Sequence, residues 1–227
     1  MNKVQSAEDL ASRIEASLLF PGATFTDVHR LCLEARRERY HAVCVNPVYV
    51  PSAVDWLKDS GIAVAAAISF PLGAGTTPTR VIEAMEAVKN GASELDIVMP
   101  LGSFKSGRLD LVRVDLGNIV NLTPTVVHKV ILETHLLADE EWPIAVDLAI
   151  EAGAQFVKNG TGNGPPVSLE VVQRLRQLIG TRCRIKAAGG IRTLEAAEAL
   201  FEAGADRIGT SMAEDIMMRF RERPGQG

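Results

Sequence analysis

The sequence has few aromatic residues and few cysteines. Aromatic residues make up 5% of the chain while apolar residues make up 47%, so we expect a folded protein with an aliphatic core. The three cysteines, Cys32, Cys44 and Cys183, are odd in number and far apart, which excludes a paired metal-binding or redox motif. Cys32 and Cys44 have apolar neighbours and read as small core residues. This cysteine usage is typical of a reducing cytoplasm.

Long basic blocks and long apolar runs are also missing. The formal net charge is −4, which argues against nucleic acid or an anionic membrane as the main partner. The longest apolar runs, such as residues 62–70, are too short to span a bilayer. Residues 1–17 lack the basic start, apolar block and cleavage site of a signal peptide. We therefore expect a cytoplasmic protein that is not attached to a membrane.

Apolar strands alternate with amphipathic helices along the whole sequence. Residues 25–38, for example, carry Val28, Leu31, Cys32 and Ala35 at helical spacing. The expected strands are 14–19, 42–45, 62–70, 93–98, 126–134, 155–158, 184–188 and 207–208. Eight strand–helix units without a linker predict one domain over residues 1–227, an α/β fold of the (β/α)8 TIM barrel type.

Both ends of the chain are expected to lie outside this repeat. A short helix capped by Ser6, with Asp9 in the reciprocal position of a capping box, is predicted before the barrel, and residues 220–227 are predicted to be a loose tail. An open doubly wound sheet is the competing fold. Against it, no Gly-x-Gly-x-x-Gly follows the first strand.

Two predicted neighbouring strands carry a lysine followed by a glycine-rich turn. Lys158 precedes Asn159-Gly160-Thr161-Gly162, and Lys186 precedes Ala187-Ala188-Gly189-Gly190. One such lysine alone reads most simply as a side chain that reaches the surface from a strand end. Two lysine ammonium groups on strands about 5 Å apart repel each other. The repulsion favours a neutral, nucleophilic amine on one of them, and such an amine can form a Schiff base.

The fourth and fifth strands carry a carboxylate and three side chains that have to be weighed as metal ligands. Asp96 lies in the fourth strand, where it can transfer protons, although an ion pair to either lysine is an ordinary alternative. Glu133 and His135 end the fifth strand, and His128 lies earlier on it. His128 and Glu133 are five positions apart and would face opposite ways on a regular strand, so we expect no metal site.

Glycine turns after the seventh and eighth strands favour an anion site. Gly189-Gly190 and Gly209-Thr210-Ser211 each precede a predicted helix, and barrels often bind phosphate at these two loops. The alternative is a pair of ordinary tight turns without a ligand.

Taken together, these motifs resemble those of the deoxyribose-phosphate aldolases, which are class I Schiff-base aldolases with a (β/α)8 barrel. The resemblance covers residues 14–217. It rests on eight stretches: 43–47, 70–77, 94–96, 105–107, 129–134, 156–158, 186–193 and 207–211.

The resemblance implies a role for each candidate residue. Lys158 would form the Schiff base, Lys186 would lower its pKa, and Asp96 would be the acid/base partner acting through water. Thr161 would lie near the substrate. The phosphate would be held by Gly189, Gly190, Gly209 and Ser211.

The resemblance also implies the reaction. 2-Deoxy-D-ribose 5-phosphate would be cleaved reversibly to D-glyceraldehyde 3-phosphate and acetaldehyde, without a metal or another cofactor. The only partners implied are the phosphorylated sugar or aldehyde substrate and a second copy of the chain in a homodimer.

Two segments depart from the family pattern. The family usually opens with an Asp-His-Thr-Leu-Leu-Lys-Pro-like stretch, where this chain has Glu15-Ala16-Ser17-Leu18-Leu19-Phe20-Pro21, and the usual Lys-Thr-Ser-Thr-Gly is Lys158-Asn159-Gly160-Thr161-Gly162. Two alternatives therefore stay open. One is a related Schiff-base aldolase for a different phosphorylated sugar or aldehyde, and the other is a non-catalytic paralogue that binds a phosphosugar.

Overall fold

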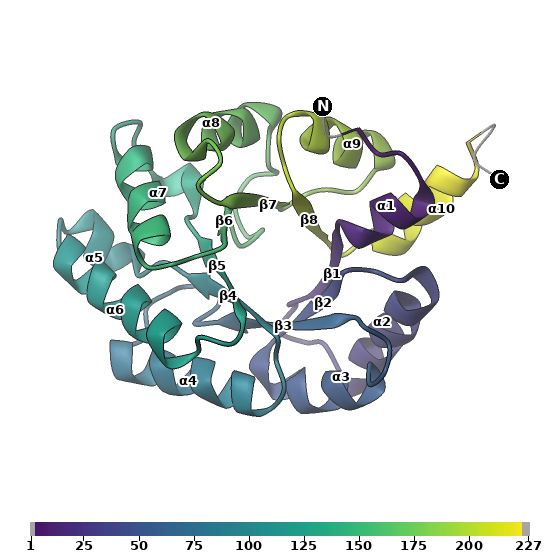
Figure 1. Cartoon of the computed structure of the whole chain (residues 1–227), viewed down its shortest axis with the longest axis horizontal. Helices are drawn as coiled ribbons and strands as arrows, with labels where there is room; N and C mark the ends of the chain where they lie inside the picture. The colour runs from purple at the N-terminus through teal and green to yellow at the C-terminus, as the bar shows by residue number, and fades with distance from the viewer. Residues whose placement is uncertain (1–2, 224–227) are drawn as a thin grey trace.

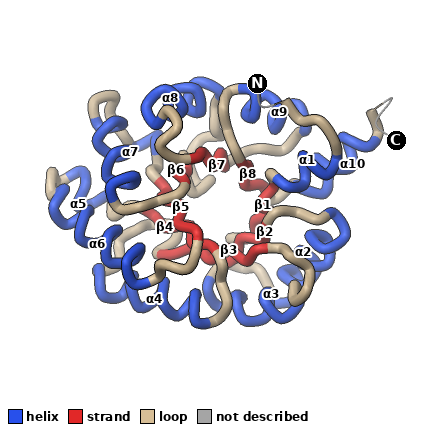
Figure 2. Tube along the Cα trace, viewed as in Figure 1, coloured by secondary structure: helices blue, strands red, loops and turns tan. Residues whose placement is uncertain are grey.

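Eight parallel strands form a closed barrel with helices around it (Figures 1 and 2). The computed structural model describes residues 3–223. The strands pair in chain order, and β8 pairs with β1 to close the barrel. They are β1 (Ile14–Leu18), β2 (Ala42–Val45), β3 (Ala63–Ile68), β4 (Glu94–Val98), β5 (Val127–Ile131), β6 (Phe156–Lys158), β7 (Arg184–Ala188) and β8 (Arg207–Thr210). The predicted (β/α)8 barrel is confirmed.

The helices lie outside the ring of strands (Figure 2). They are α1 (Ala7–Ser12), α2 (Phe25–Glu38), α3 (Val50–Trp56), α4 (Thr77–Lys89), α5 (Leu101–Lys105), α6 (Leu109–Leu122), α7 (Glu141–Glu151), α8 (Leu169–Ile179), α9 (Leu194–Glu202) and α10 (Ala213–Arg221). Two 3-10 turns, η1 (Pro47–Tyr49) and η2 (Thr134–Leu136), follow β2 and β5. The first and last helices, α1 and α10, pack against each other (Figure 1). Between residues 3 and 223, no helix is both long and apolar enough to cross a membrane.

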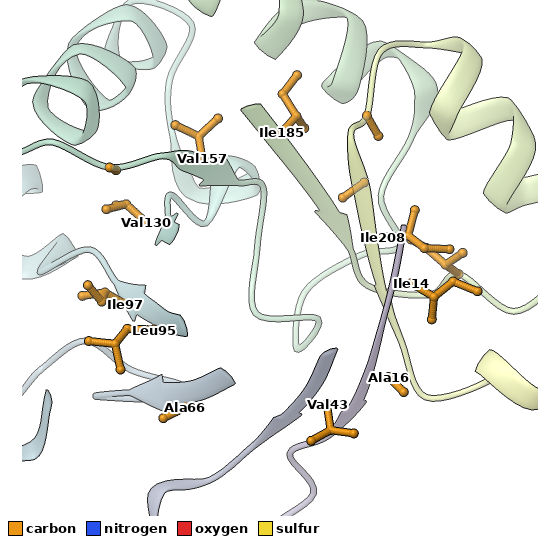
Figure 3. Packing of buried hydrophobic residues seen from close by; sticks show 14 of the residues in the cluster. Ile14, Ala16, Val43, Ala66, Leu95, Ile97, Val130, Val157, Ile185 and Ile208 are labelled. Carbon is orange, nitrogen blue, oxygen red and sulfur yellow. The ribbon is translucent and has the colours of Figure 1, made fainter. Parts of the chain in front are cut away.

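Alternate residues of each strand face two different environments. Buried apolar side chains such as Ile14, Leu95, Val130 and Ile185 belong to one hydrophobic cluster that also includes the inner faces of the helices. In Figure 3 the labelled members of this cluster ring the barrel rather than fill its centre. Because side chains alternate along a strand, the residues between them point into the barrel. Most of the folding energy from apolar burial therefore lies between the strands and the helices.

Local sequence signals set several helix ends. Ser6 accepts a hydrogen bond from the Asp9 amide, as predicted, but the Asp9 carboxylate accepts from the Gln5 amide rather than from Ser6. Thr24 and Asp27 form a complete capping box at the start of α2. The glycines before β4, β6 and β8 have left-handed φ angles of 97°, 94° and 117°, as expected where a helix ends. They are Gly91, Gly153 and Gly204.

The structure differs from the predicted boundaries by one or two residues at several strand ends, and by more at the following places. The strand predicted over 126–134 ends at Ile131, so Glu133 and His135 lie beyond it rather than on it. The strand predicted over 62–70 is confined to Ala63–Ile68. A separate short helix, α5, precedes α6. The predicted loose tail is helical as far as Arg221, and residues 224–227 lie outside the described part of the chain.

A buried arginine forms hydrogen bonds to the turn after β3 and to the end of β4. Arg80, on α4, is fully buried and donates to the carbonyl oxygens of Gly73 (2.8 Å) and Val98 (2.5 Å). Its guanidinium also lies 3.0 Å from Asp115 on α6. Gly73 has a φ of 62°, and a Cβ there would come within 2.4 Å of the Met99 carbonyl oxygen, so the turn that Arg80 binds requires glycine.

We expect Arg80→Met to destabilise the barrel by about 3–5 kcal/mol, because it leaves the buried Asp115 carboxylate without a charged partner, with only the Thr77 hydroxyl donating to it, and removes the arginine donors from two buried carbonyl groups. Urea unfolding followed by circular dichroism measures this. The matched control is Arg30→Met, which removes an arginine whose side chain is 75% exposed. Equal unfolding midpoints for the two variants would contradict the expectation.

Candidate active site

Ionisable side chains fill the centre of the barrel. Glu15, Asp96, Lys129 and Lys186 are fully buried, and the side chain of Lys158 is 2% exposed. In the order named, they come from β1, β4, β5, β7 and β6. Each lies at an inward-facing position of its strand, and at least one of its sequence neighbours belongs to the hydrophobic cluster. Closure of the barrel brings them together although 171 positions separate Glu15 from Lys186.

Asp96 lies at the centre of this cluster. One carboxylate oxygen, Oδ2, accepts hydrogen bonds from the Nζ atoms of Lys158 (2.8 Å) and Lys186 (2.7 Å). The other, Oδ1, accepts from the Nζ of Lys129 at 2.9 Å. The three residues singled out from the sequence as catalytic candidates, Lys158, Lys186 and Asp96, are thus in direct contact.

Four further members of the cluster, Glu15, Glu94, Lys129 and Arg207, were not identified from the sequence as parts of the site. Glu15 binds the ammonium groups of Lys129 (3.0 Å) and Lys186, and Glu94 binds Lys129 at 2.5 Å. Arg207 lies 3.0 Å from Glu94 and 3.2 Å from Glu15. A signal was available: Glu94 and Asp96 are two apart on one strand, and Lys129 is the residue opposite Asp96 on the next.

The cluster controls the protonation of its members. Burial opposes ionisation of Asp96, but the neighbouring ammonium groups of Lys129, Lys158 and Lys186 outweigh it and hold the pKa of this carboxyl well below its usual range. Burial likewise favours neutral Lys186, but the carboxylates of Asp96 and Glu15 outweigh it and raise the lysine pKa. Lys186 is therefore held in its charged form.

A cavity of about 570 Å³ opens at the carboxyl ends of the strands. Of the two predicted lysines, Lys158 lines it, whereas Lys186 and Asp96 lie behind Lys158 and do not. Arg192 is exposed and also lines the cavity, and the described lining includes no carboxylate. A substrate in this cavity would meet the Lys158 amine first.

The glycine turns predicted to bind an anion line the same cavity. Thr161, Gly189, Gly190, Gly209 and Ser211 all belong to its wall. Gly209 also makes room for the cluster, because a Cβ there would lie 3.0 Å from Lys186 Cε. α10 begins two residues after Ser211 without a side-chain cap, so its first amide groups remain available to an anion.

The residues weighed as metal ligands have other partners. His128 is buried, and its Nε2 lies 2.8 Å from the Thr123 hydroxyl. Glu133 hydrogen bonds to Thr161, and its carboxylate is 4.0 Å from His135 Nδ1. Over residues 3–223, no three His, Cys, Asp or Glu side chains come close enough to hold a metal ion.

Comparison with known proteins identifies the family. The model of the DeoC/LacD family aldolases matches residues 8–218. A deoxyribose-phosphate aldolase from Caldanaerobacter subterraneus subsp. tengcongensis is 41% identical over 98% of both chains, and one from Carboxydothermus hydrogenoformans is 44% identical over 93% of this chain and 95% of its own.

A solved structure agrees with the sequence relatives. The tetrameric deoxyribose phosphate aldolase from Aeropyrum pernix superposes with a TM-score of 0.90 at 36% identity, covering 96% of this chain and 93% of the other. Both the sequence and the barrel with its buried lysines thus point to one family, and the chain belongs to the DeoC/LacD family of aldolases.

Proposed function

We propose that the protein is a deoxyribose-phosphate aldolase that cleaves 2-deoxy-D-ribose 5-phosphate reversibly to D-glyceraldehyde 3-phosphate and acetaldehyde. The observation that carries the proposal is the contact between one cavity-lining lysine and a buried charged pair. Lys158 lines the cavity, and its Nζ lies 2.8 Å from an Asp96 oxygen that also binds Lys186. The relatives named above, which are deoxyribose-phosphate aldolases, support the same reaction.

In this mechanism the neutral Lys158 amine attacks C1 of the open-chain sugar and gives a carbinolamine, which loses water to form an iminium ion. Removal of the C3 hydroxyl proton breaks the C2–C3 bond. The bonding electrons pass to the iminium, which becomes an enamine, and glyceraldehyde 3-phosphate leaves. Protonation of the enamine at C2 and addition of water then release acetaldehyde and restore the amine.

The other candidate residues support this chemistry from fixed positions. Charged Lys186 and ionised Asp96 form the electrostatic surroundings of Lys158, and we propose that Asp96 orients the water through which protons move. We propose that Gly189, Gly190, Gly209 and Ser211 bind the phosphate through glycine-turn and helix-start amides. The adjacent exposed Arg192 adds a positive charge, and Thr161 lies near the sugar.

We extend the proposal to the organisation of the protein. The chain acts as one domain over residues 1–227, as a cytoplasmic homo-oligomer and specifically a homodimer, and takes part in the breakdown of deoxyribose phosphates. Support for oligomerisation comes from the Aeropyrum pernix relative, whose structure is described as tetrameric. Light scattering after size exclusion distinguishes a dimer from a monomer or a tetramer.

Borohydride trapping tests the nucleophile. With acetaldehyde and sodium borohydride, we expect a reduced ethyl adduct on the peptide that contains Lys158, read by intact and peptide mass, because the iminium is the species that hydride reduces. The adduct should be absent from Lys158→Ala and retained by Lys89→Ala, which removes an exposed lysine on α4. A folded wild-type protein without an adduct would refute the aldolase proposal.

The pH dependence of turnover tests the state of Asp96. A carboxyl with a lowered pKa keeps its charge at every pH above that pKa, so Asp96 stays ionised from about pH 5 to about pH 9. Asp96→Asn should therefore lower kcat by a similar factor, about 10²-fold, throughout this range. The profiles of both proteins are measured with 2-deoxy-D-ribose 5-phosphate. Disappearance of an acidic limb in the variant alone would contradict the expectation.

A further inference from the structure

Glu133 is a buried carboxylate that the proposed chemistry does not use. It follows β5 in a left-handed conformation, with a φ of 49°, which is uncommon for a residue with a side chain. The residue is 6% exposed. Within residues 3–223, no lysine or arginine forms an ion pair with it, and its nearest cationic candidate is His135 at 4.0 Å. A buried carboxylate held this way needs hydrogen-bond donors.

Both donors come from one residue of the loop after Lys158. The Glu133 Oε1 atom accepts the backbone N–H of Thr161, and Oε2 accepts its hydroxyl at 3.2 Å. The Thr161 hydroxyl oxygen in turn accepts the N–H of Asn163 at 3.2 Å. Thr161, Gly162 and Asn163 all line the large cavity. The Thr161 hydroxyl proton is therefore engaged with Glu133, and toward a substrate this group presents its oxygen lone pair.

The loop of residues 160–164 needs side-chain hydrogen bonds to hold it in place, because a cavity lies on each side of it. A second cavity of about 80 Å³ lies behind it, lined by Glu133, His135, Trp142 and the glycines of the loop. Gly162 and the β7 residue Ala188 belong to the walls of both cavities. The segment 160–164 is thus a thin, glycine-rich wall between two cavities, and glycine alone restrains a backbone weakly.

The other end of the loop is fixed to the next strand. The Asn159 side-chain amide donates to the Ala188 carbonyl at 3.0 Å, and its oxygen accepts the Ala188 N–H at 2.8 Å. Ala188 directly precedes the Gly189-Gly190 turn. Glu133, Thr161, Asn159 and Ala188 therefore join the carboxyl ends of β5, β6 and β7 on the side of the cavity that carries the anion-binding turns.

We propose that Glu133 is a positioning residue of the aldolase site, which holds the Thr161–Asn163 segment against the cavity and so sets the affinity for the phosphorylated sugar. The inference rests on the proposed function. It assigns Glu133 to substrate binding through Thr161, not to contact with the reacting atoms. Acetaldehyde has neither the sugar hydroxyls nor the phosphate, so its reaction with Lys158 does not depend on this wall.

The first test compares Glu133→Gln with Glu140→Gln, which makes the same change at an exposed position of the adjoining α7 start. Glutamine keeps one acceptor oxygen but replaces the other with an amide nitrogen that cannot accept. We expect KM for 2-deoxy-D-ribose 5-phosphate to rise about tenfold in Glu133→Gln, the effect of one lost hydrogen bond to a charged group. Borohydride trapping of acetaldehyde and the Glu140→Gln constants should match those of the wild type.

A double-mutant cycle separates positioning from general stabilisation. Thr161→Val removes the hydroxyl but keeps the backbone N–H, so Glu133→Gln combined with Thr161→Val should raise KM by less than the product of the single effects. The proposal would be overturned if the KM increase of the double variant equalled the product of the two single increases. It would also be overturned if KM were unchanged in both single variants. If Glu133→Gln fails to fold, amide exchange of residues 159–164 in Thr161→Val, which loses one of the two hydrogen bonds to Glu133, provides the test.

Amide hydrogen exchange measures how firmly the loop is held, and it does not depend on catalytic turnover. Peptides that cover residues 159–164 should exchange faster in Glu133→Gln than in the wild type or Glu140→Gln, because the Thr161 and Asn163 amides lose their acceptors or their support. Unchanged exchange would overturn the proposal. A wild type that neither cleaves the sugar phosphate nor traps acetaldehyde would refute the proposed function instead, and exchange would then decide whether Glu133 holds the loop.

Discussion

The mutual neutralisation of ionised side chains inside the barrel is the constraint on which the site depends. Asp96 is shared by three ammonium groups, and Glu15 and Glu94 hold the remaining positive charge of Lys129, Lys186 and Arg207. Removing one member of such a set leaves its partners charged in a poorly solvating interior. The composition of the barrel interior is therefore far more restricted than that of an ordinary core.

Lys158 differs from its lysine neighbours in its contacts and in its access to the cavity. Lys129 and Lys186 are enclosed by two or more carboxylates, and the pKa values of both are raised. Lys158 contacts one carboxylate and is the member of the three that lines the cavity. The same ionic cluster that keeps two lysines charged thus presents the third to a carbonyl compound. The mutual repulsion of two neighbouring lysines, which was the argument from the sequence, does not by itself make this distinction.

Much of the fold and part of the site could be predicted from local patterns. Strand–helix alternation predicted the barrel, and the placement of Lys158, Lys186 and Asp96 on its strands predicted that they meet. Lys158 ends β6 as expected, but Asp96 and Lys186 lie at the middle of β4 and β7 rather than at their ends. Lys129, opposite Asp96 on the next strand, could have been found, but the role of Glu15 could not, because its contact with Lys129 exists only once β1 and β5 face each other across the closed barrel. The link from Glu133 to the loop after Lys158 was missed for a related reason: it depends on how the chain turns after β5, which hydrophobic periodicity does not encode.

The alternation of side chains along each strand separates two kinds of selection. Positions such as Ile97, Val130 and Val157 pack against helices, whereas their immediate neighbours in sequence face the charged interior. Heat tolerance can therefore evolve by repacking the outer positions, one methyl group at a time, while the reaction centre stays intact. Laboratory evolution of this enzyme can treat outward-facing and inward-facing strand positions as separate libraries, one for stability and the other for new chemistry.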